Sequence, residues 1–406
     1  MELPAIEGGK PVRDTFKEYF PRISDYEKQL VLSVLESGRL ASGVGTFVHR
    51  FEEEYARFIG VKYSLAVSNG TAALHTAVAS LGIGVGDEVI TTPFSFVATA
   101  TAVLHNNAIP VFGDIELDTL NLDPETIVDK ITPRTRAILV VHLAGHPAEM
   151  DEIMKIAREN GLAVIEDCAQ AIGSEYKGRK VGSIGDVGAF SFYQSKNMTT
   201  GEGGMVTTND EAVYRKARLF VEHGSEERYY HTTLGWNYRM TELQAALGLG
   251  QLSRIEELNR AREEIARIYS DELASLDGDL VLLPKPRKHV KHTWHIYQVL
   301  LRLENLRVSR DRVVEAVRRE NVLVLVSYPR VIYENPLFQK LDAYGRGCPW
   351  SCPYYGGKVS YKPGLSPKAE LAARSVVTLP TLAGMSADDA VDTAKALKKV
   401  LLYYRK

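Results

Sequence analysis

Short apolar segments alternate with helix-like segments over the first 240 residues, and this alternation constrains the fold more than any other feature. The segments "SLAVS", "EVIT", "IPVF", "AILVV" and "LAVIED" have the length and apolar character of buried strands. Helix-like segments such as "NGTAALHTAVASLG" and "EMDEIMKIARENG" separate them. This order predicts a mostly parallel sheet with crossover helices. Two more extended segments, "GAFSF" and "GMVTT", extend the sheet, so we expect one large α/β domain over residues 1–240.

The remaining sequence predicts a connecting helix and a second, smaller domain. Apolar positions spaced by three and four residues predict one long helix over residues 241–275. Extended and helical segments then mix over residues 276–406, which indicates a smaller α+β domain. A segment rich in Pro and Gly, residues 341–367, interrupts this domain, and we expect it to be a loop.

The composition is that of an ordinary globular protein and argues against several classes. The 406 residues include 49 Lys and Arg against 51 Asp and Glu, a formal net charge of −2. This balance gives no support for binding to nucleic acid or to an anionic membrane. The sequence shows neither a secretion signal nor a run of about eighteen apolar residues. We therefore expect a cytoplasmic protein.

The three cysteines fit free thiols in a reducing compartment, because an odd and small number does not build a disulfide framework. Cys348 and Cys352 are spaced like half of a metal site. No second cysteine pair and no cluster of histidines supplies the other ligands, so we expect no metal.

Polar residues follow several predicted strands, where open α/β sheets bind their ligands. Gly70 and Thr71 begin a helix after "SLAVS", and the free N–H groups of such a turn suit a phosphate, although a simple capped turn would look the same. Asp167 ends "LAVIED", where a carboxylate needs a cation or several donors. A helix cap or a salt bridge would meet that need, and so would the protonated ring nitrogen of pyridoxal phosphate (PLP).

Three further residues complete a set that suits PLP. Phe96, in "TPFSFVAT", could stack on the ring, and Ser191 could donate a hydrogen bond to the phosphate. Lys196, in "SFYQSKNMTTGEGG", could form a Schiff base with the aldehyde. A phosphate site, a ring stack, an acid and a lysine occur together in one α/β chain, and this combination predicts a PLP enzyme.

The sequence resembles the DegT/StrS family of sugar aminotransferases, which are PLP enzymes of fold type I. The resemblance runs from about Gly38 to Pro380 and is carried by "SNGTAAL", "GDEVITTPFSFVATATAV", "HLAGHPAEMDEI", "VIEDCAQAIGSEYKGRKVGSIGDVGAFSFYQSKNMTTGEGGMVTTND" and "GWNYRMTELQAALGLGQL". It implies a large domain with a mixed, mostly parallel sheet flanked by helices, and a smaller α+β domain.

The resemblance also implies roles for individual residues. PLP would bind Lys196, with Asp167 at the pyridine nitrogen, Phe96 over the ring and Gln170 near the ring. The phosphate would be bound by Gly70, Thr71 and Ser191, and by Asn237 of a partner subunit in a homodimer with shared sites. Lysine at position 196 favours transamination, because dehydrating relatives in the family have histidine there.

The substrate side of the site is less defined by the sequence. His292, His295 and Tyr328 match substrate-side motifs of the family, and Arg239 could hold an anion, but packing histidines and an interface salt bridge explain these residues equally well. We expect glutamate as the amino donor and a nucleotide-linked keto-deoxysugar as the acceptor. A keto-cyclitol such as an inosose is the alternative acceptor, and a non-catalytic regulator on the same scaffold is the alternative of another class. The segment 341–367 matches no family pattern and is expected near the distal part of the acceptor.

Overall fold

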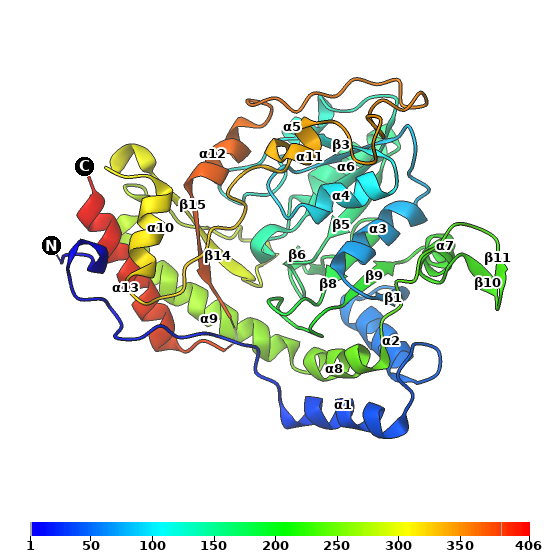
Figure 1. The fold of residues 1–406 in the computed structure, drawn as a ribbon, viewed down its shortest axis with the longest axis horizontal. Helices are drawn as coiled ribbons and strands as arrows, with labels where there is room; N and C mark the ends of the chain where they lie inside the picture. The colour runs from blue at the N-terminus through cyan, green and yellow to red at the C-terminus, as the bar shows by residue number, and fades with distance from the viewer. Residues whose placement is uncertain (1, 383) are drawn as a thin grey trace.

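The computed structural model of the chain, which describes residues 2–382 and 384–406, contains a large mixed sheet with helices on both faces (Figure 1). Its strand order is β1-β9-β8-β5-β4-β2-β3. Only β9 runs antiparallel to its neighbours. The bounds are β1 Tyr63–Val67, β2 Glu88–Thr91, β3 Ile109–Phe112, β4 Thr135–Val141, β5 Ala163–Asp167, β8 Val187–Ser191 and β9 Gly204–Thr208. The predicted mostly parallel sheet is confirmed.

Alternation along the strands explains how both faces of this sheet are covered. Leu139 and Val141 of β4 belong to the core shared with α3 and α4, whereas Ile138 and Val140 belong to the core shared with α6. Successive strand residues point to opposite faces, so a strand that is buried on both sides is apolar throughout. The helices around the sheet are α2 Phe47–Ile59, α3 Gly70–Ser80, α4 Ala98–His105, α5 Glu125–Val128, α6 Met150–Asn160 and α7 Glu211–Val221. Small two-residue and three-residue strands lie at its margins: β6 Glu175–Tyr176, β7 Arg179–Lys180, β10 Ser225–Glu227, β11 Tyr230–His231 and β13 Val290–Lys291.

The smaller domain is a three-stranded antiparallel sheet packed against helices. Its strands are β12 Val281–Leu282, β14 Ile296–Leu301 and β15 Val376–Pro380, in the order β12-β14-β15. Helices α10 Arg310–Arg318 and α13 Ala387–Tyr404 pack with them in a core of their own. The two ends of the described chain lie on this domain (Figure 1). Within the described residues, every helix is either too short or too polar to cross a membrane.

The predicted long helix is two helices in the structure. α8 spans Glu242–Leu252 and α9 spans Ile255–Leu273, with a turn at Ser253 and Arg254 between them. α8 packs against α1 (Asp25–Ser37) and α2, and the later part of α9 contributes Tyr269 and Leu273 to the core of the small domain. The helical spacing of apolar residues continues across the turn, so periodicity alone does not mark the break.

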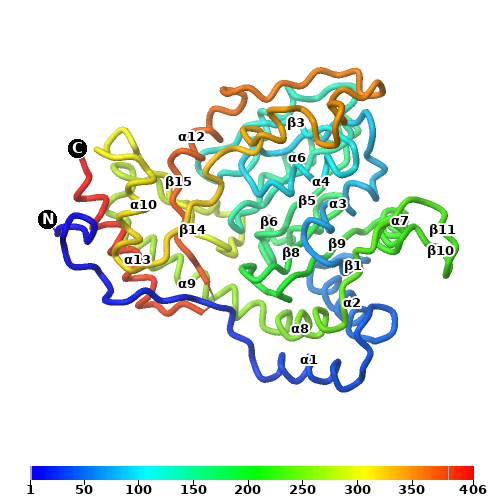
Figure 2. The backbone as a smooth tube through the Cα atoms, viewed as in Figure 1, coloured from blue at the N-terminus to red at the C-terminus, as the bar shows by residue number. Residues whose placement is uncertain are grey.

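The segment 341–367 packs on the large domain rather than extending from the small one. Trp350, Tyr355 and Tyr361 are buried in the core of the large sheet, as are residues of the elements on either side, η5 Ile332–Glu334, α11 Pro336–Gln339 and α12 Pro367–Ser375. Figure 2 shows the segment, in orange, running across the top of the large domain over β3. Part of the range 276–406, which was predicted to form the smaller domain, therefore belongs to the core of the large domain.

Candidate active site

Three of the predicted site residues meet at one edge of the large sheet because they end or follow strands that run in the same direction. Asp167 is the last residue of β5 and Ser191 is the last residue of β8, its parallel neighbour. Gly70 begins α3 after β1, and Asn69 caps this helix by accepting a hydrogen bond from the Ala72 N–H at 2.8 Å. The carboxyl ends of parallel strands lie on the same edge, so this convergence follows from the topology.

Gly70 and Ser191 are in such close contact that no larger residue fits at position 70. A Cβ built on Gly70 would lie 2.6 Å from the Ser191 Cβ and 2.9 Å from its Oγ. The Ser191 hydroxyl therefore sits directly against the N-terminus of α3, where Thr71 is half-buried. A hydroxyl beside free N–H groups of a helix N-terminus is an arrangement that suits a phosphate.

Asp167 is buried and is supported by two donors. Its Oδ2 accepts a hydrogen bond from the Thr99 hydroxyl at 2.9 Å, and its Oδ1 accepts one from the Ala169 N–H at 3.2 Å. Burial raises the pKa of Asp167, against the lowering effect of these donors and of the positive charge on Lys196. A buried carboxylate with a raised pKa gains stability when a cation comes next to it.

Lys196 lies in the loop after β8, and its side chain is half-buried. Burial and the nearby charge of Arg262 lower the pKa of the Lys196 amine to about 8, while Asp167 acts in the opposite direction. A larger fraction of this amine is therefore neutral near neutral pH than for an exposed lysine. A neutral amine is the form that attacks a carbonyl group or takes up a proton.

Gln170 connects this region to Tyr328, which packs against the core of the large domain. Its Oε1 accepts from the Ala144 N–H at 2.9 Å, and its Nε2 donates to the Tyr328 hydroxyl at 2.7 Å. Phe96, in contrast, is 61% exposed. Its neighbour Phe94 is buried and packs edge-on against Tyr328.

The two predicted histidines differ in their surroundings. His292 stacks on Trp294 with ring centroids 3.9 Å apart, and its Nδ1 accepts from the Trp294 N–H at 2.9 Å. His295 is buried, its Nδ1 has no hydrogen-bond partner among the described residues, and burial followed by the charges of Lys196 and Arg262 keeps its pKa far below the ordinary value. His295 therefore lies close to the lysine, whereas His292 packs against an aromatic ring.

Asn237 and Arg239 lie on a segment that runs past the end of β1. Arg239 forms an isolated bridge with Val67, and the Ser68 N–H donates to the Tyr238 carbonyl at 2.7 Å. Asn237 is exposed, and its backbone forms an isolated bridge with Glu222.

Sequence reasoning missed two buried partners of the site. Glu166, which directly precedes Asp167, accepts hydrogen bonds from the His142 Nε2 at 3.0 Å and from three backbone N–H groups. The Cys168 thiol is near the same group, but the Glu166 oxygens are occupied by these donors, so the cluster is a structural network rather than a set of free metal ligands. The available signal for Glu166 was a polar residue inside an apolar strand.

Arg262 of α9 was also missed. Its position in the helical pattern of polar and apolar residues is that of an ordinary surface residue.

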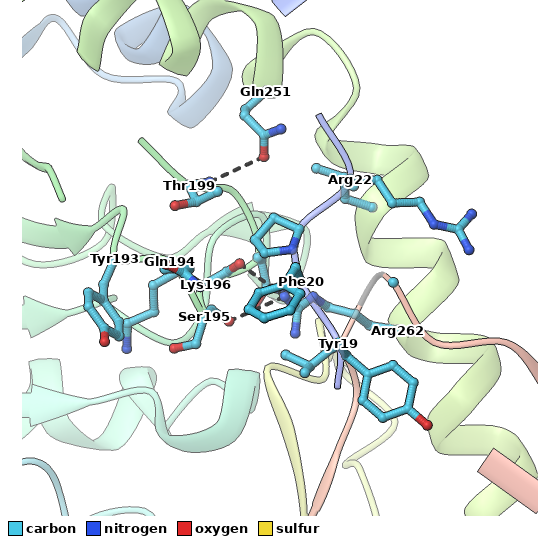
Figure 3. A pocket seen from close by; sticks show the side chains of 15 residues that line it. Tyr19, Phe20, Arg22, Tyr193, Gln194, Ser195, Lys196, Thr199, Gln251 and Arg262 are labelled. Atoms are coloured by element: carbon cyan, nitrogen blue, oxygen red, sulfur yellow. Dashed lines mark hydrogen bonds between the residues drawn. The ribbon is translucent and has the colours of Figure 1, made fainter. Parts of the chain in front are cut away.

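A cavity of about 140 Å³ lies beside the lysine loop. It is lined by the loop residues 193–197, by Arg262 and by the N-terminal segment 19–22. Figure 3 shows Phe20 in front of the Arg262 guanidinium, with hydrogen bonds joining Arg262 to the loop. Asp167 and Ser191 are not part of its lining, so the cavity lies beside the cluster at the strand ends and not within it.

Comparison with known proteins places this arrangement in one family. A model described as the DegT/DnrJ/EryC1/StrS aminotransferase family matches residues 21–352. The chain belongs to this family. It is 43% identical to a GDP-perosamine synthase of Caulobacter vibrioides over 297 residues. The aligned region covers 73% of this chain and 79% of the relative. It is also 39% identical to a putative L-glutamine:3-amino-2,3-dideoxy-scyllo-inosose aminotransferase of Micromonospora echinospora over 328 residues. This aligned region covers 78% of each chain. The solved structure of Helicobacter pylori PseC, an aminotransferase involved in the biosynthesis of pseudoaminic acid, has a TM-score of 0.84 and 30% identity over 96% of this chain and 100% of that chain.

These findings confirm the prediction of a sugar aminotransferase of the DegT/StrS family with fold type I, and PLP is the cofactor of this family. The chain is therefore an aminotransferase. The residues present fit the cofactor. The contact between Gly70 and Ser191 is a cradle that a Cβ would fill. The described residues direct two donors at the buried Asp167 carboxylate, which leaves two of its four lone pairs for a cationic partner.

Proposed function

We propose that this aminotransferase moves an amino group from glutamate to the ketone of a nucleotide-linked deoxysugar. The observation that carries the proposal is the convergence of Lys196, Asp167 and the Gly70–Ser191 contact at one sheet edge. Support for a nucleotide-linked acceptor comes from the relative named GDP-perosamine synthase, which is similar over most of this chain.

The proposed roles of the cofactor-binding residues follow from their chemistry. Asp167 holds the ring nitrogen of PLP in its protonated form, because an ionised carboxylate stabilises an adjacent cation. With this partner PLP supplies an electron sink for the reaction. The remaining proposed contacts are with the phosphate and the ring, and they involve Gly70, Thr71, Ser191, Phe96 and Gln170.

Lys196 is the proposed acid and base. Its Nζ would hold the cofactor at rest. Once the amino group of the donor takes that place, the freed amine would take up a proton from the α-carbon of the donor and return a proton later in the cycle. The lowered pKa of the amine, about 8, supports this role, because a base near the operating pH works in both directions. His295, buried and neutral, lies close enough to orient a substrate group, and Arg239, His292 and Tyr328 are further candidates for contacts with the acceptor.

The cofactor and residue roles are tested by titrating the purified protein with PLP. We expect the protein to gain visible absorbance and to lose it when glutamate is added. Lys196→Ala should lose the stable absorbance, whereas Lys155→Ala, which alters an exposed lysine, should behave as the parent. Asp167→Asn should bind PLP but transaminate at least tenfold more slowly, a loss of about 1.4 kcal/mol of transition-state stabilisation. A protein that stays colourless with PLP, or an Asp167→Asn variant with the parental rate, contradicts these roles.

A keto-cyclitol is the second candidate acceptor. It is favoured by the similarity to the putative inosose aminotransferase, which covers 78% of this chain. The two candidates are separated by incubating the aminated cofactor form of the enzyme with GDP-linked and TDP-linked keto-deoxysugars and with a scyllo-inosose. Return of the original absorbance with a nucleotide sugar alone supports the first proposal, and return with the inosose alone supports the second.

We also propose that the enzyme is a homodimer in which Asn237 completes the phosphate site of the partner subunit. Asn237 follows a run of exposed large side chains on and after the β10–β11 hairpin: Tyr229, Tyr230, Leu234 and Trp236, which are 81%, 60%, 79% and 45% exposed. Exposed apolar groups clustered in this way mark contact surfaces. The hairpin projects from the large domain beyond α7 (Figure 1).

Mixing two inactive variants tests this shared site. Lys196→Ala and Asn237→Ala each lack activity in every site, but a mixed dimer combines both lesions in one site and leaves the other intact. We expect partial recovery of activity after subunit exchange. If exchange is verified by mass spectrometry and no activity returns, Asn237 does not contribute to the partner's site.

A further inference from the structure

One face of α9 holds the backbone of the lysine loop. Asn259 and Arg262 lie three residues apart and therefore on the same side of the helix. The Asn259 Oδ1 accepts a hydrogen bond from the Asn197 Nδ2 at 2.8 Å. The Arg262 Nη2 donates to the carbonyl oxygens of Lys196 at 2.9 Å and Ser195 at 3.3 Å, as Figure 3 shows.

Arg262 also joins the loop to the small domain. Its Nη1 donates to the carbonyl of His295, beside the start of β14, at 3.1 Å. Three backbone carbonyls from two segments far apart in the sequence thus converge on one guanidinium. Only arginine has a planar fork with five donors that can bridge such carbonyls, since a lysine ammonium is a single point.

Within the described residues, no carboxylate forms an ion pair with Arg262. The side chain is 3% exposed, all of its hydrogen-bond partners are carbonyl oxygens, and its Nε has no partner among the described residues. Burial lowers the pKa of Arg262 to about 10, so it is still charged at neutral pH. Burying a cation without a paired carboxylate costs folding free energy. A role of Arg262 in the site would explain its burial.

We propose that Arg262 is the positioning residue of Lys196: it fixes the backbone that carries the amine and holds an uncompensated positive charge near it. This inference rests on the proposed function only in taking Lys196 as the reacting amine. The charged and titratable groups that face the amine are Asp167 from β5, Arg262 from α9 and His295 at the start of β14. His295 is neutral, so Arg262 is the group that opposes the attraction of Asp167 for the ammonium form.

The proposal predicts separate effects of charge and of geometry on Lys196. Removing the charge in Arg262→Gln should raise the pKa of the Lys196 amine, because the ammonium form loses a repulsive neighbour. The expected rise is on the order of one unit, the size of a Coulomb interaction between charges several ångströms apart near a protein surface. Asn259→Ala is the matched control, since it removes a loop contact from the same helix face without changing charge.

The test uses the full-length enzyme stripped of PLP, with no substrate present. The rate at which an amine-modifying reagent labels Lys196 is followed by peptide mass spectrometry between pH 6 and 11. The midpoint should lie near pH 8 in the parent and in Asn259→Ala, and about one unit higher in Arg262→Gln. Arg310→Gln, which removes a buried arginine that contacts the carbonyls of Ala373 and Val376 elsewhere, should leave the midpoint unchanged. A midpoint in Arg262→Gln equal to that of the parent overturns the proposal.

A second measurement keeps the proposal testable if Arg262→Gln does not fold. Arg262→Lys keeps a positive charge but loses the planar fork, so backbone amides of residues 193–200 should exchange hydrogen for deuterium at least tenfold faster than in the parent. Unchanged exchange in Arg262→Lys overturns the positioning role. Failure of the proposed function is distinguishable, because a lysine that does not bind PLP would fail the PLP titration while its labelling midpoint still depends on Arg262.

Discussion

Replacing Glu166 with glutamine should destabilise the protein by about 3 kcal/mol, because an amide cannot accept the hydrogen bonds that this buried carboxylate receives. One oxygen of Glu166 accepts from the His142 Nε2 at 3.0 Å and the Gly182 N–H at 2.9 Å. The other oxygen accepts from the Ile184 N–H at 2.8 Å and the Gly185 N–H at 2.7 Å. In either orientation of a glutamine, its NH₂ group faces two donors.

The histidine cannot adapt to this change. The His142 Nδ1 accepts from the Ala148 N–H at 3.1 Å, which assigns the ring proton to Nε2 and makes it a donor toward Glu166. Two hydrogen bonds to a charged group are therefore lost, at roughly 1.5–3 kcal/mol each. The lower cost of burying a neutral amide offsets part of this loss, which leaves a net effect of about 3 kcal/mol.

Urea unfolding followed by circular dichroism measures the effect. Glu159→Gln is the control, because Glu159 is 61% exposed, its ion pair with Lys155 is 4.0 Å long, and its change should stay within about 0.5 kcal/mol. Burial raises the pKa of Glu166, but the donors from His142, Gly182 and Gly185 outweigh it and keep the folded-state pKa below the ordinary value. The stability that the carboxylate contributes is thus present above the unfolded-state pKa and lost as the pH falls toward the folded-state value. The difference between parent and variant should shrink in acid, and equal stability of the two at pH 7 would refute the reasoning.

Three further changes test other parts of the fold. Gly70→Ala should lower the free energy of unfolding by about 2 kcal/mol, because its Cβ would lie 2.6 Å from the Ser191 Cβ, and adding Ser191→Gly should recover part of that loss in the same unfolding assay. Tyr355→Phe should cost about 2 kcal/mol in thermal or urea unfolding, since it removes the 2.8 Å hydrogen bond to the buried Glu88 carboxylate. Gln298→Leu should raise the unfolding free energy by about 1 kcal/mol, because both polar atoms of this buried amide lack partners among the described residues, and a loss of stability would show that the amide is satisfied in solution.

The strand ends of the site could be predicted from the sequence because topology fixes them. Once "LAVIED" and "GAFSF" are parallel neighbours, Asp167 and Ser191 must lie at the same edge of the sheet. The capping box of Ser24 and Glu27 at the start of α1 likewise depends only on local spacing. Features that depend on a few adjacent residues or on strand direction are encoded locally.

The buried residues that hold the site in place, Arg262 and Glu166, could not be predicted. Each of them depends on hydrogen-bond partners far away in the sequence. Arg262 lies on an amphipathic helix where arginine normally faces water, and its three carbonyl partners carry no side-chain signal. Glu166 is satisfied mainly by backbone N–H groups of the turn at residues 182–185, which only the folded chain brings near. Backbone partners of this kind leave no residue-type pattern in the sequence.

The segment 341–367 shows why a loop signal does not define what a loop does. Its Pro and Gly content predicted a loop, and its aromatic residues pack on the large sheet. The Tyr361 hydroxyl donates to the Pro110 carbonyl of β3 at 2.6 Å, and Tyr355 binds Glu88 at the start of β2. β3 is an edge strand, and edge strands need cover against pairing with other chains. The contact with the start of β2 lies at the opposite end of that strand from the edge that carries Asp167 and Ser191. Through Tyr355 and Tyr361 the segment therefore covers the edge of the sheet, and its place near the distal part of the acceptor stays a prediction.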